Sequence, residues 1–142
     1  MSILAEVFVS TKSDALRYEV ETKSGHEPAA ERFEVVRYSR LTSLEFGTLW
    51  AILESAEWDV NRHMLKSLAH SDETWLEEFP DSYVSLLASA EEDHLLSASK
   101  AWGASEELQC AGEELVPILR DLRRLAVLAN ANGKGLFLWG SL

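Results

Sequence analysis

The sequence has very little cysteine: Cys110 is the only one among 142 residues. A single cysteine excludes an intrachain disulfide and the four-cysteine zinc sites. A lone thiol is also typical of proteins that fold in a reducing compartment. The first residues lack a basic segment, and Glu6 interrupts their apolar run, which is unlike a secretory signal peptide. We therefore expect a cytoplasmic protein.

Long hydrophobic runs are missing too. Residues 136–139 form one of the longest apolar stretches and have the length of a strand, whereas a membrane-spanning helix needs about 18–20 apolar residues. Basic residues are scarce in one region, because residues 72–114 contain 12 acids and one base, Lys100, within a chain of net charge −11. Such a negative field repels nucleic-acid phosphates and anionic membranes. The sequence thus predicts neither a nucleic-acid nor a membrane partner.

Motifs of catalysis and cofactor binding are also lacking. The chain has no glycine-rich phosphate loop, no Gly-x-Ser-x-Gly elbow, no His-Glu-x-x-His pair and no EF-hand loop. His63 follows Asp59 by four residues and could approach Glu54, but a second histidine with metal-ligand spacing is absent, so a partly exposed structural histidine is the favoured interpretation. We predict no catalytic residue, no metal ligand and no cofactor.

The surroundings of Cys110 argue against a nucleophilic thiol. Its neighbours in the sequence include Glu106, Glu107, Glu113 and Glu114. Negative charges raise the pKa of a thiol and so reduce the fraction of reactive thiolate. We therefore expect Cys110 to be a small structural residue.

What the chain does contain is enough apolar material for a packed core. Its length is that of one common domain, and 46% of its residues are hydrophobic, so we expect residues 1–142 to form a single globular domain. Residues 3–9 are predicted to form a buried strand. Residues 16–23 alternate apolar and polar side chains and predict a second strand, although a helix beginning at Asp14 competes. Residues 24–28 are predicted to be a loop and residues 32–39 a third strand.

The clearest local signal marks the start of a helix after residue 41. Thr42 and Glu45 match a capping box. In this motif the side chain of each residue accepts a hydrogen bond from the backbone N–H of the other. Leu41 and Phe46 match the hydrophobic staple that accompanies such a cap. Phe46 also begins an apolar series at helical spacing that continues to Leu53.

Further helices are predicted after Asp59, after Pro80, within residues 91–110 and from about Glu113 to Asn132-Gly133. Residues 135–139 return as a terminal strand able to pair with the N-terminal ones. The predicted fold class is α+β: a small, mainly antiparallel sheet of three N-terminal strands (residues 2–40) and a C-terminal strand (residues 135–140). Four or five helices from residues 43–131 cover this sheet.

The acidic doublets lie near predicted helix starts, where carboxylates favour the helix dipole. Neighbouring helical positions point about 100° apart, so no doublet forms one catalytic dyad. Capping does not explain why Lys and Arg are nearly absent over residues 72–114. We therefore expect a non-enzymatic binding or regulatory protein that engages a basic partner protein through an acidic helical surface. The residues expected to carry this binding are Glu106, Glu107, Glu113, Glu114 and Trp75, the tryptophan being placed in a loop or at a helix start.

Two alternatives remain open from the sequence. One is a small-ligand-binding protein or enzyme with a pocket between sheet and helices near His63. The other is a plain homodimer whose acidity only keeps it soluble. A deep polar pocket favours the first alternative, and an exposed apolar patch around Trp58 or Trp75 favours the second.

Overall fold

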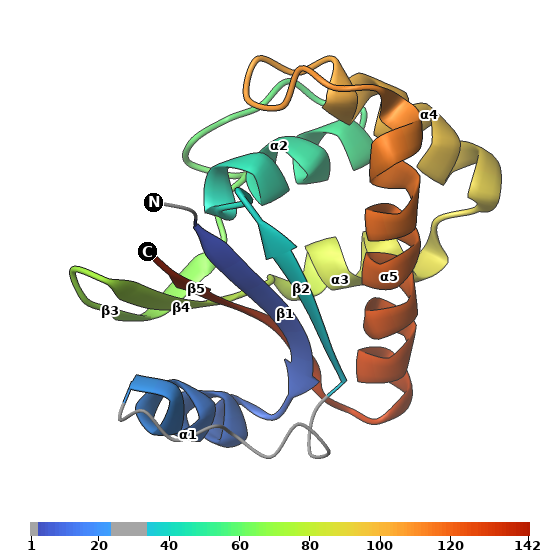
Figure 1. The fold of residues 1–142 in the computed structure, drawn as a ribbon. Coiled ribbons are helices and arrows are strands. Elements are labelled where there is room, and N and C mark those ends of the chain that lie inside the picture. Colours follow the sequence, from blue (N-terminus) through green and yellow to red (C-terminus); the bar gives the residue numbers. More distant parts are fainter. Residues whose placement is uncertain (1–2, 24–33) are drawn as a thin grey trace.

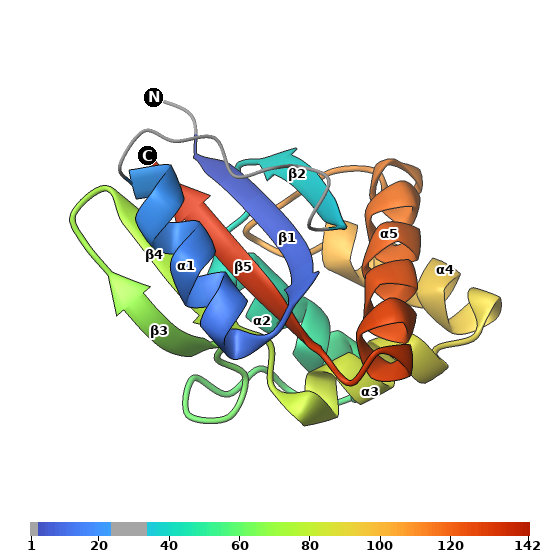
Figure 2. The same ribbon diagram turned by 90° about the horizontal axis from the view of Figure 1, so that it is seen from below.

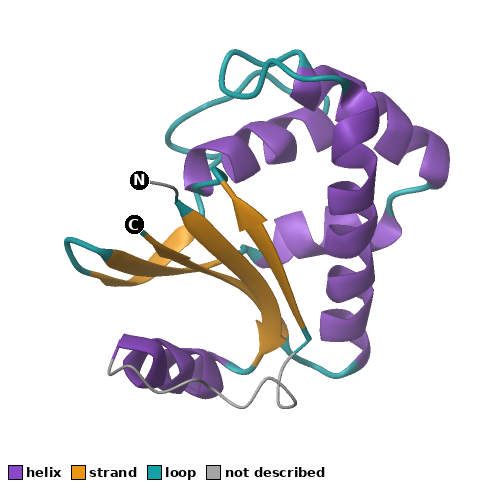
Figure 3. Cartoon of the chain, viewed as in Figure 1, coloured by secondary structure: helices purple, strands orange, loops and turns teal. Residues whose placement is uncertain are grey.

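The computed structural model describes residues 3–23 and 34–142, and in this part of the chain five strands form one sheet. The order of the strands is β2-β1-β5-β4-β3, and every neighbouring pair is antiparallel (Figures 1 and 3). The strands are β1 (Leu4–Ser10), β2 (Val35–Ser39), β3 (Lys66–His70), β4 (Thr74–Glu78) and β5 (Gly135–Ser141). The helices are α1 (Lys12–Lys23), α2 (Ser43–Leu53), α3 (Asp81–Ser89), α4 (Glu92–Gly103) and α5 (Gly112–Ala131).

The sheet is covered on both faces. Helix α1 packs against β3, β4 and β5 on one side, here called the α1 face, and α2 to α5 lie on the other side, the α2–α5 face (Figures 1 and 2). Side chains of the central strands alternate between these faces, so Val7 and Leu138 join the core under α2–α5, while Phe8 and Phe137 join the one under α1. Burial on both sides explains why β1 and β5 are almost wholly apolar.

The predicted α+β class, the antiparallel sheet and the terminal strand are confirmed. Strand β5 pairs with β1 along its whole length, with Phe8 opposite Phe137. The helices predicted after Pro80, within 91–110 and from about Glu113 are present as α3, α4 and α5. Gly133 has a φ of +62° immediately after α5, the left-handed conformation expected of the residue that ends a helix. No helix within the described residues has the length and apolarity that a membrane span requires.

The second predicted strand, residues 16–23, is wrong, because this segment is helix α1. Thr11 precedes the helix, and its side-chain Oγ1 accepts the N–H of Asp14 at 3.2 Å. The buried positions are Ala15, Tyr18 and Glu19, which share one helical face. Leu16, which contributed to the alternating pattern, is 40% exposed. The predicted loop at 24–28 and the start of the third strand at 32–33 lie outside the described residues, and the rest of that strand is β2.

The helix predicted after Asp59 is also wrong, and the sheet gains two strands that the sequence analysis missed. Residues 60–62 form a turn within an irregular loop, and the N–H of Asp59 donates to His63 Nδ1 across this turn at 3.0 Å. Val60 and Met64 are exposed, so they do not share a buried helical face with Leu65. Residues 66–78 then form the β3–β4 hairpin at the edge of the sheet. Trp75, expected in a loop or at a helix start, lies within β4 and is half-buried.

The predicted start of α2 is confirmed in detail. Thr42 Oγ1 accepts the N–H of Leu44 at 3.3 Å, and the N–H of Thr42 donates to Glu45 Oε2 at 3.2 Å, which completes the capping box. Later in the helix, Gly47 allows the 58–64 loop to lie against α2, because a Cβ at this position would be 2.3 Å from the carbonyl oxygen of His63. The first half of α2 therefore lies directly against this loop.

Candidate functional site

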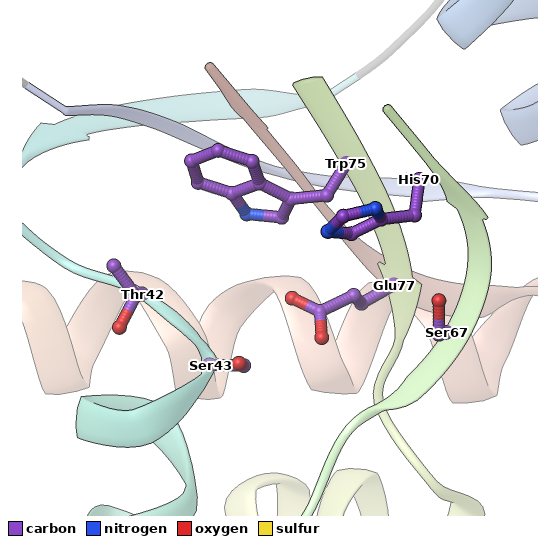
Figure 4. A pocket seen from close by; sticks show the side chains of 6 residues that line it. All are labelled: Thr42, Ser43, Ser67, His70, Trp75 and Glu77. Carbon is purple, nitrogen blue, oxygen red and sulfur yellow. The ribbon is translucent and has the colours of Figure 1, made fainter. Parts of the chain in front are cut away.

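A polar pocket of about 300 Å³ lies between the β3–β4 hairpin and the N-terminus of α2 (Figure 4). Figure 4 shows the Glu77 side chain directed toward Ser43, with the Trp75 and His70 rings on one side of it. The residues that line the pocket are Thr42, Ser43, Ser67, His70, Trp75 and Glu77.

The hairpin brings four of these residues together as two cross-strand pairs, Ser67 with Glu77 and His70 with Trp75. Ser67 and His70 are three residues apart, so a regular strand would point them to opposite faces. The register shift between Ser67 and Ala69 inserts one extra residue, which restores both side chains to the same face. Accordingly, Leu68 and Ala69 both pack on the α1 face. The bulge is therefore the feature that adds His70 to the pocket.

Trp75 forms a wall of the pocket because its cross-strand neighbour in β5 has no side chain. Trp75 is paired with Gly140, and a Cβ at that position would lie 2.2 Å from the indole ring. The indole therefore lies directly on the β5 backbone. This contact leaves Trp75 half-buried and holds it at the edge of the cavity.

Glu77 is the most unusual group in the pocket. Its carboxyl is half-buried, and within the described residues no cationic side chain pairs with it. Burial raises the pKa of Glu77 to about 7, and a hydrogen bond with Ser43 opposes this rise. Thr42 and Glu45 are bonded to each other in the capping box, so Ser43 is the side chain of this helix end that reaches Glu77. A carboxyl that titrates near neutrality in a cavity is a candidate functional group.

An apolar groove of about 170 Å³ shares one lining residue, Ser43, with the polar pocket. Four apolar side chains form it, and each is 45–50% exposed. They are Leu44, Trp58, Val60 and Met64. The groove is also lined by His63, the residue of the 58–64 loop whose backbone lies against α2 at Gly47.

His63 is buried in the structure, not partly exposed as was expected from the sequence. It is 2% exposed, its Nδ1 accepts the N–H of Asp59, and its Nε2 lies 2.8 Å from Glu54 Oε1. These bonds assign the neutral tautomer with the proton on Nε2. Glu54 also binds Arg62, and the ring of Trp50 meets His63 edge-on at 5.3 Å. Both nitrogens are thus occupied, and no group of three potential metal ligands converges anywhere in the described chain.

The predicted partner-binding residues fall into two places. Glu106, Glu107, Glu113 and Glu114 are all exposed and lie in the α4–α5 connection or the first turn of α5. Trp75 does not join them, because it lies in β4 beside the polar pocket. The arginines of α5 do not neutralise these glutamates within the described residues: Arg120 and Arg123 pair with Glu92, and Arg124 pairs with Glu34.

Cys110 is half-buried in the same connection. Burial raises the pKa of its thiol, and the nearby Glu114 carboxylate raises it further. The direction of this pKa shift is the one predicted, but burial is its largest cause, and Glu114 is the flanking glutamate that adds to it.

Ser43, Ser67, His70 and Glu77 are site residues that were not predicted from the sequence. The available signal was the polar turn at 71–73 between two short runs that contain apolar residues, a pattern typical of a hairpin. Comparison with protein-family models, with curated proteins and with solved structures found no match for this chain. A proposal for its function therefore depends on the geometry of the pocket.

Proposed function

We propose that this protein is a binding protein whose polar pocket receives an ammonium or guanidinium group, paired with Glu77 and stacked on Trp75. The observation that carries this proposal is Glu77 itself, a half-buried carboxyl at a cavity with no cationic partner among the described residues. A bound cation would supply the partner that the carboxylate lacks, and would favour its ionised form.

The charge of the pocket favours a cation over an anion. Within the described structure, its lining includes one carboxyl and no lysine or arginine. The positive end of the α2 dipole favours an anion by about 0.3–1 kcal/mol. Repulsion between an anion and ionised Glu77 at 4 Å costs about 4 kcal/mol at an effective dielectric constant of 20. The repulsion is the larger effect, and the net charge of −11 adds to it.

Trp75 and Glu77 offer a cation two kinds of contact. A cation over an indole face gains about 0.5–2 kcal/mol, and a hydrogen bond to a charged group about 1.5–3 kcal/mol. Together they correspond to a Kd on the order of millimolar for a small ammonium ion. We therefore expect the pocket alone to give weak, selective binding.

This proposal is tested by titrating ¹⁵N-labelled protein with methylammonium chloride and following the indole N–H resonance of Trp75, assigned with Trp75→Phe. We expect a saturable shift that equal concentrations of sodium chloride and acetamide do not produce. Glu77→Gln should abolish it. Glu78→Gln is the matched control, because it removes the same charge from the next position, which faces α1 opposite Phe137. Equal responses from the two variants would contradict the proposal.

A second candidate function is docking of a basic partner protein on the acidic surface of Glu106, Glu107, Glu113 and Glu114. Its support is that the α5 arginines pair elsewhere, which leaves these exposed carboxylates to act on a partner. Opposite fields accelerate association, and salt screens them. A pull-down at low salt, repeated with all four residues changed to lysine, tests it. A partner retained equally by both proteins would refute it.

A further inference from the structure

We infer that the ligand is an amphiphilic amine, with its cationic group in the polar pocket and its attached apolar chain in the groove of Leu44, Trp58, Val60 and Met64. This inference rests on the proposed function, since it extends the same site by its neighbouring cavity.

The first step is that the two cavities have a lining residue in common. Ser43 lines both the polar pocket and the apolar groove, because it stands at the first residue of α2 between the β3–β4 hairpin and the 58–64 loop. A ligand that fills both must therefore carry its charge next to its apolar part. A primary amine at the end of a short alkyl or aryl group has this form.

The second step is that the groove is already formed. Exposed apolar side chains are common when scattered, but here four of them surround one cavity. Its wall is fixed by the hydrogen bonds of His63 to Asp59 and Glu54. The loop is also held close to α2, where the Trp58 Nε1 lies 3.5 Å from the Cβ position of Gly47. A preformed apolar groove binds a chain without first ordering its own residues.

The third step is the sign of the charge on the amphiphile. The residues described at the groove include no lysine or arginine, and Arg62 beside it is engaged by Glu54. Glu57 and Asp59, which flank Trp58 in the sequence, are exposed. A carboxylate or sulfate amphiphile would meet negative charge at Glu77 and along this loop. Charge complementarity therefore selects an amine over a fatty acid.

The test compares methyl-, butyl- and hexylammonium, with hexanoate and hexanol as controls, by the same Trp75 resonance. Each methylene that enters the groove should tighten binding about fourfold. Hexanoate should produce no shift, and hexanol should bind far more weakly than hexylammonium.

Groove variants separate this inference from the proposed function. Met64→Ala and Val60→Ala should flatten the dependence on chain length and leave methylammonium binding unchanged. Val127→Ala is the control, because Val127 is similarly exposed but lies on α5. Both groove positions are exposed, and the ¹H–¹⁵N spectrum of each variant verifies its fold.

The outcomes discriminate clearly. If methylammonium binds but affinity does not increase with chain length, the inference of an amphiphilic ligand is wrong and the proposed cation site still stands. Failure of every amine removes the proposed function and this inference together. Hexylammonium binding that survives Glu77→Gln at full strength shows that the chain binds by itself and overturns the joint site.

Discussion

Two regions of this protein contain acidic side chains that differ in their exposure to solvent. The four glutamates of the α4–α5 connection and the first turn of α5 are exposed, so water solvates each carboxylate. Glu77 is half-buried beside Trp75 and Ser43, and its pKa is raised to about 7. Many exposed carboxylates create a field, whereas one desolvated carboxylate creates a specific site. Charge counts from the sequence draw attention to the first region, but the structure places the more perturbed group in the second.

The largest effect that separates the two regions is a dependence of stability on pH. In the folded state the pKa of Glu77 is about 7, above its ordinary value of 4.5, so the folded protein holds this proton more tightly than the unfolded chain. The resulting stabilisation is fully present below pH 4.5 and is lost as the pH rises to about 7. A shift of this size corresponds to about 3 kcal/mol.

Urea denaturation at pH 4.5 and pH 7.5 measures this effect in the wild-type protein and in Glu77→Gln. As the pH rises, we expect the free energy of unfolding of the wild type to decrease relative to that of Glu77→Gln. Glu113→Gln, taken from the exposed region, should follow the wild type. If the free energy of unfolding of the Glu77 and Glu113 variants depends on pH in the same way, burial does not distinguish the two carboxyls and this prediction is wrong.

Gly140→Ala tests what holds the wall of the pocket. A Cβ at 140 would lie 2.2 Å from the indole of Trp75, so the ring must move. Overpacking of this kind costs about 1–3 kcal/mol, measured as a lower denaturation midpoint. The variant should also weaken methylammonium binding. Gly133→Ala is a useful contrast, since among the described residues no atom beyond its chain neighbours lies within 4 Å of its Cβ position, and its cost comes from backbone conformation. Retention of full binding by Gly140→Ala would show that Trp75 does not form the wall.

The start of α2 was predictable because its determinants are local. Thr42, Glu45, Leu41 and Phe46 lie within six residues, and their spacing alone specifies the cap. Residues 16–23 were misassigned because two patterns compete there. The helical pattern of buried positions includes a glutamate, Glu19, and hydrophobic periodicity does not predict that a glutamate is buried.

The pocket was beyond the reach of sequence patterns. Its α2 residues and Glu77 are separated by more than thirty positions, and they meet only because the β3–β4 hairpin adds to the edge of the sheet beside β5. The bulge that directs His70 inward also breaks the alternation by which β3 could have been recognised. The spacing of Val60, Met64 and Leu65 is typical of a helix, but these residues belong to an irregular loop. Val60 and Met64 line the apolar groove, and Leu65 lies in the core.

Thr42→Ala tests a third role of an acidic side chain near the pocket, since Glu45 and Thr42 together cap α2. Removing the Thr42 hydroxyl leaves the N–H of Leu44 without its acceptor and should lower stability by about 1 kcal/mol. The start of α2 also positions Ser43 against Glu77, so methylammonium binding should weaken slightly. Thr42→Ser, which retains the hydroxyl, should restore most of the stability. An unchanged midpoint in the alanine variant would mean that the cap contributes little.

The smallest predicted effect lies within the exposed acidic region itself. Glu113 and Glu114 occupy the first turn of α5, where a negative charge interacts favourably with the helix dipole, whereas Glu106 and Glu107 precede the helix. Glu113→Gln should therefore cost about 0.5 kcal/mol at low salt, and Glu106→Gln should cost close to nothing. Denaturation in 20 mM and 500 mM sodium chloride checks this difference, because salt screens the dipole interaction between exposed groups. Equal costs at both positions would show that these carboxylates act only as a diffuse field, and salt-independent costs would point to a contact other than the dipole. Either result would leave unchanged the contrast with Glu77, because its properties depend on its own burial and not on the number of acidic residues around it.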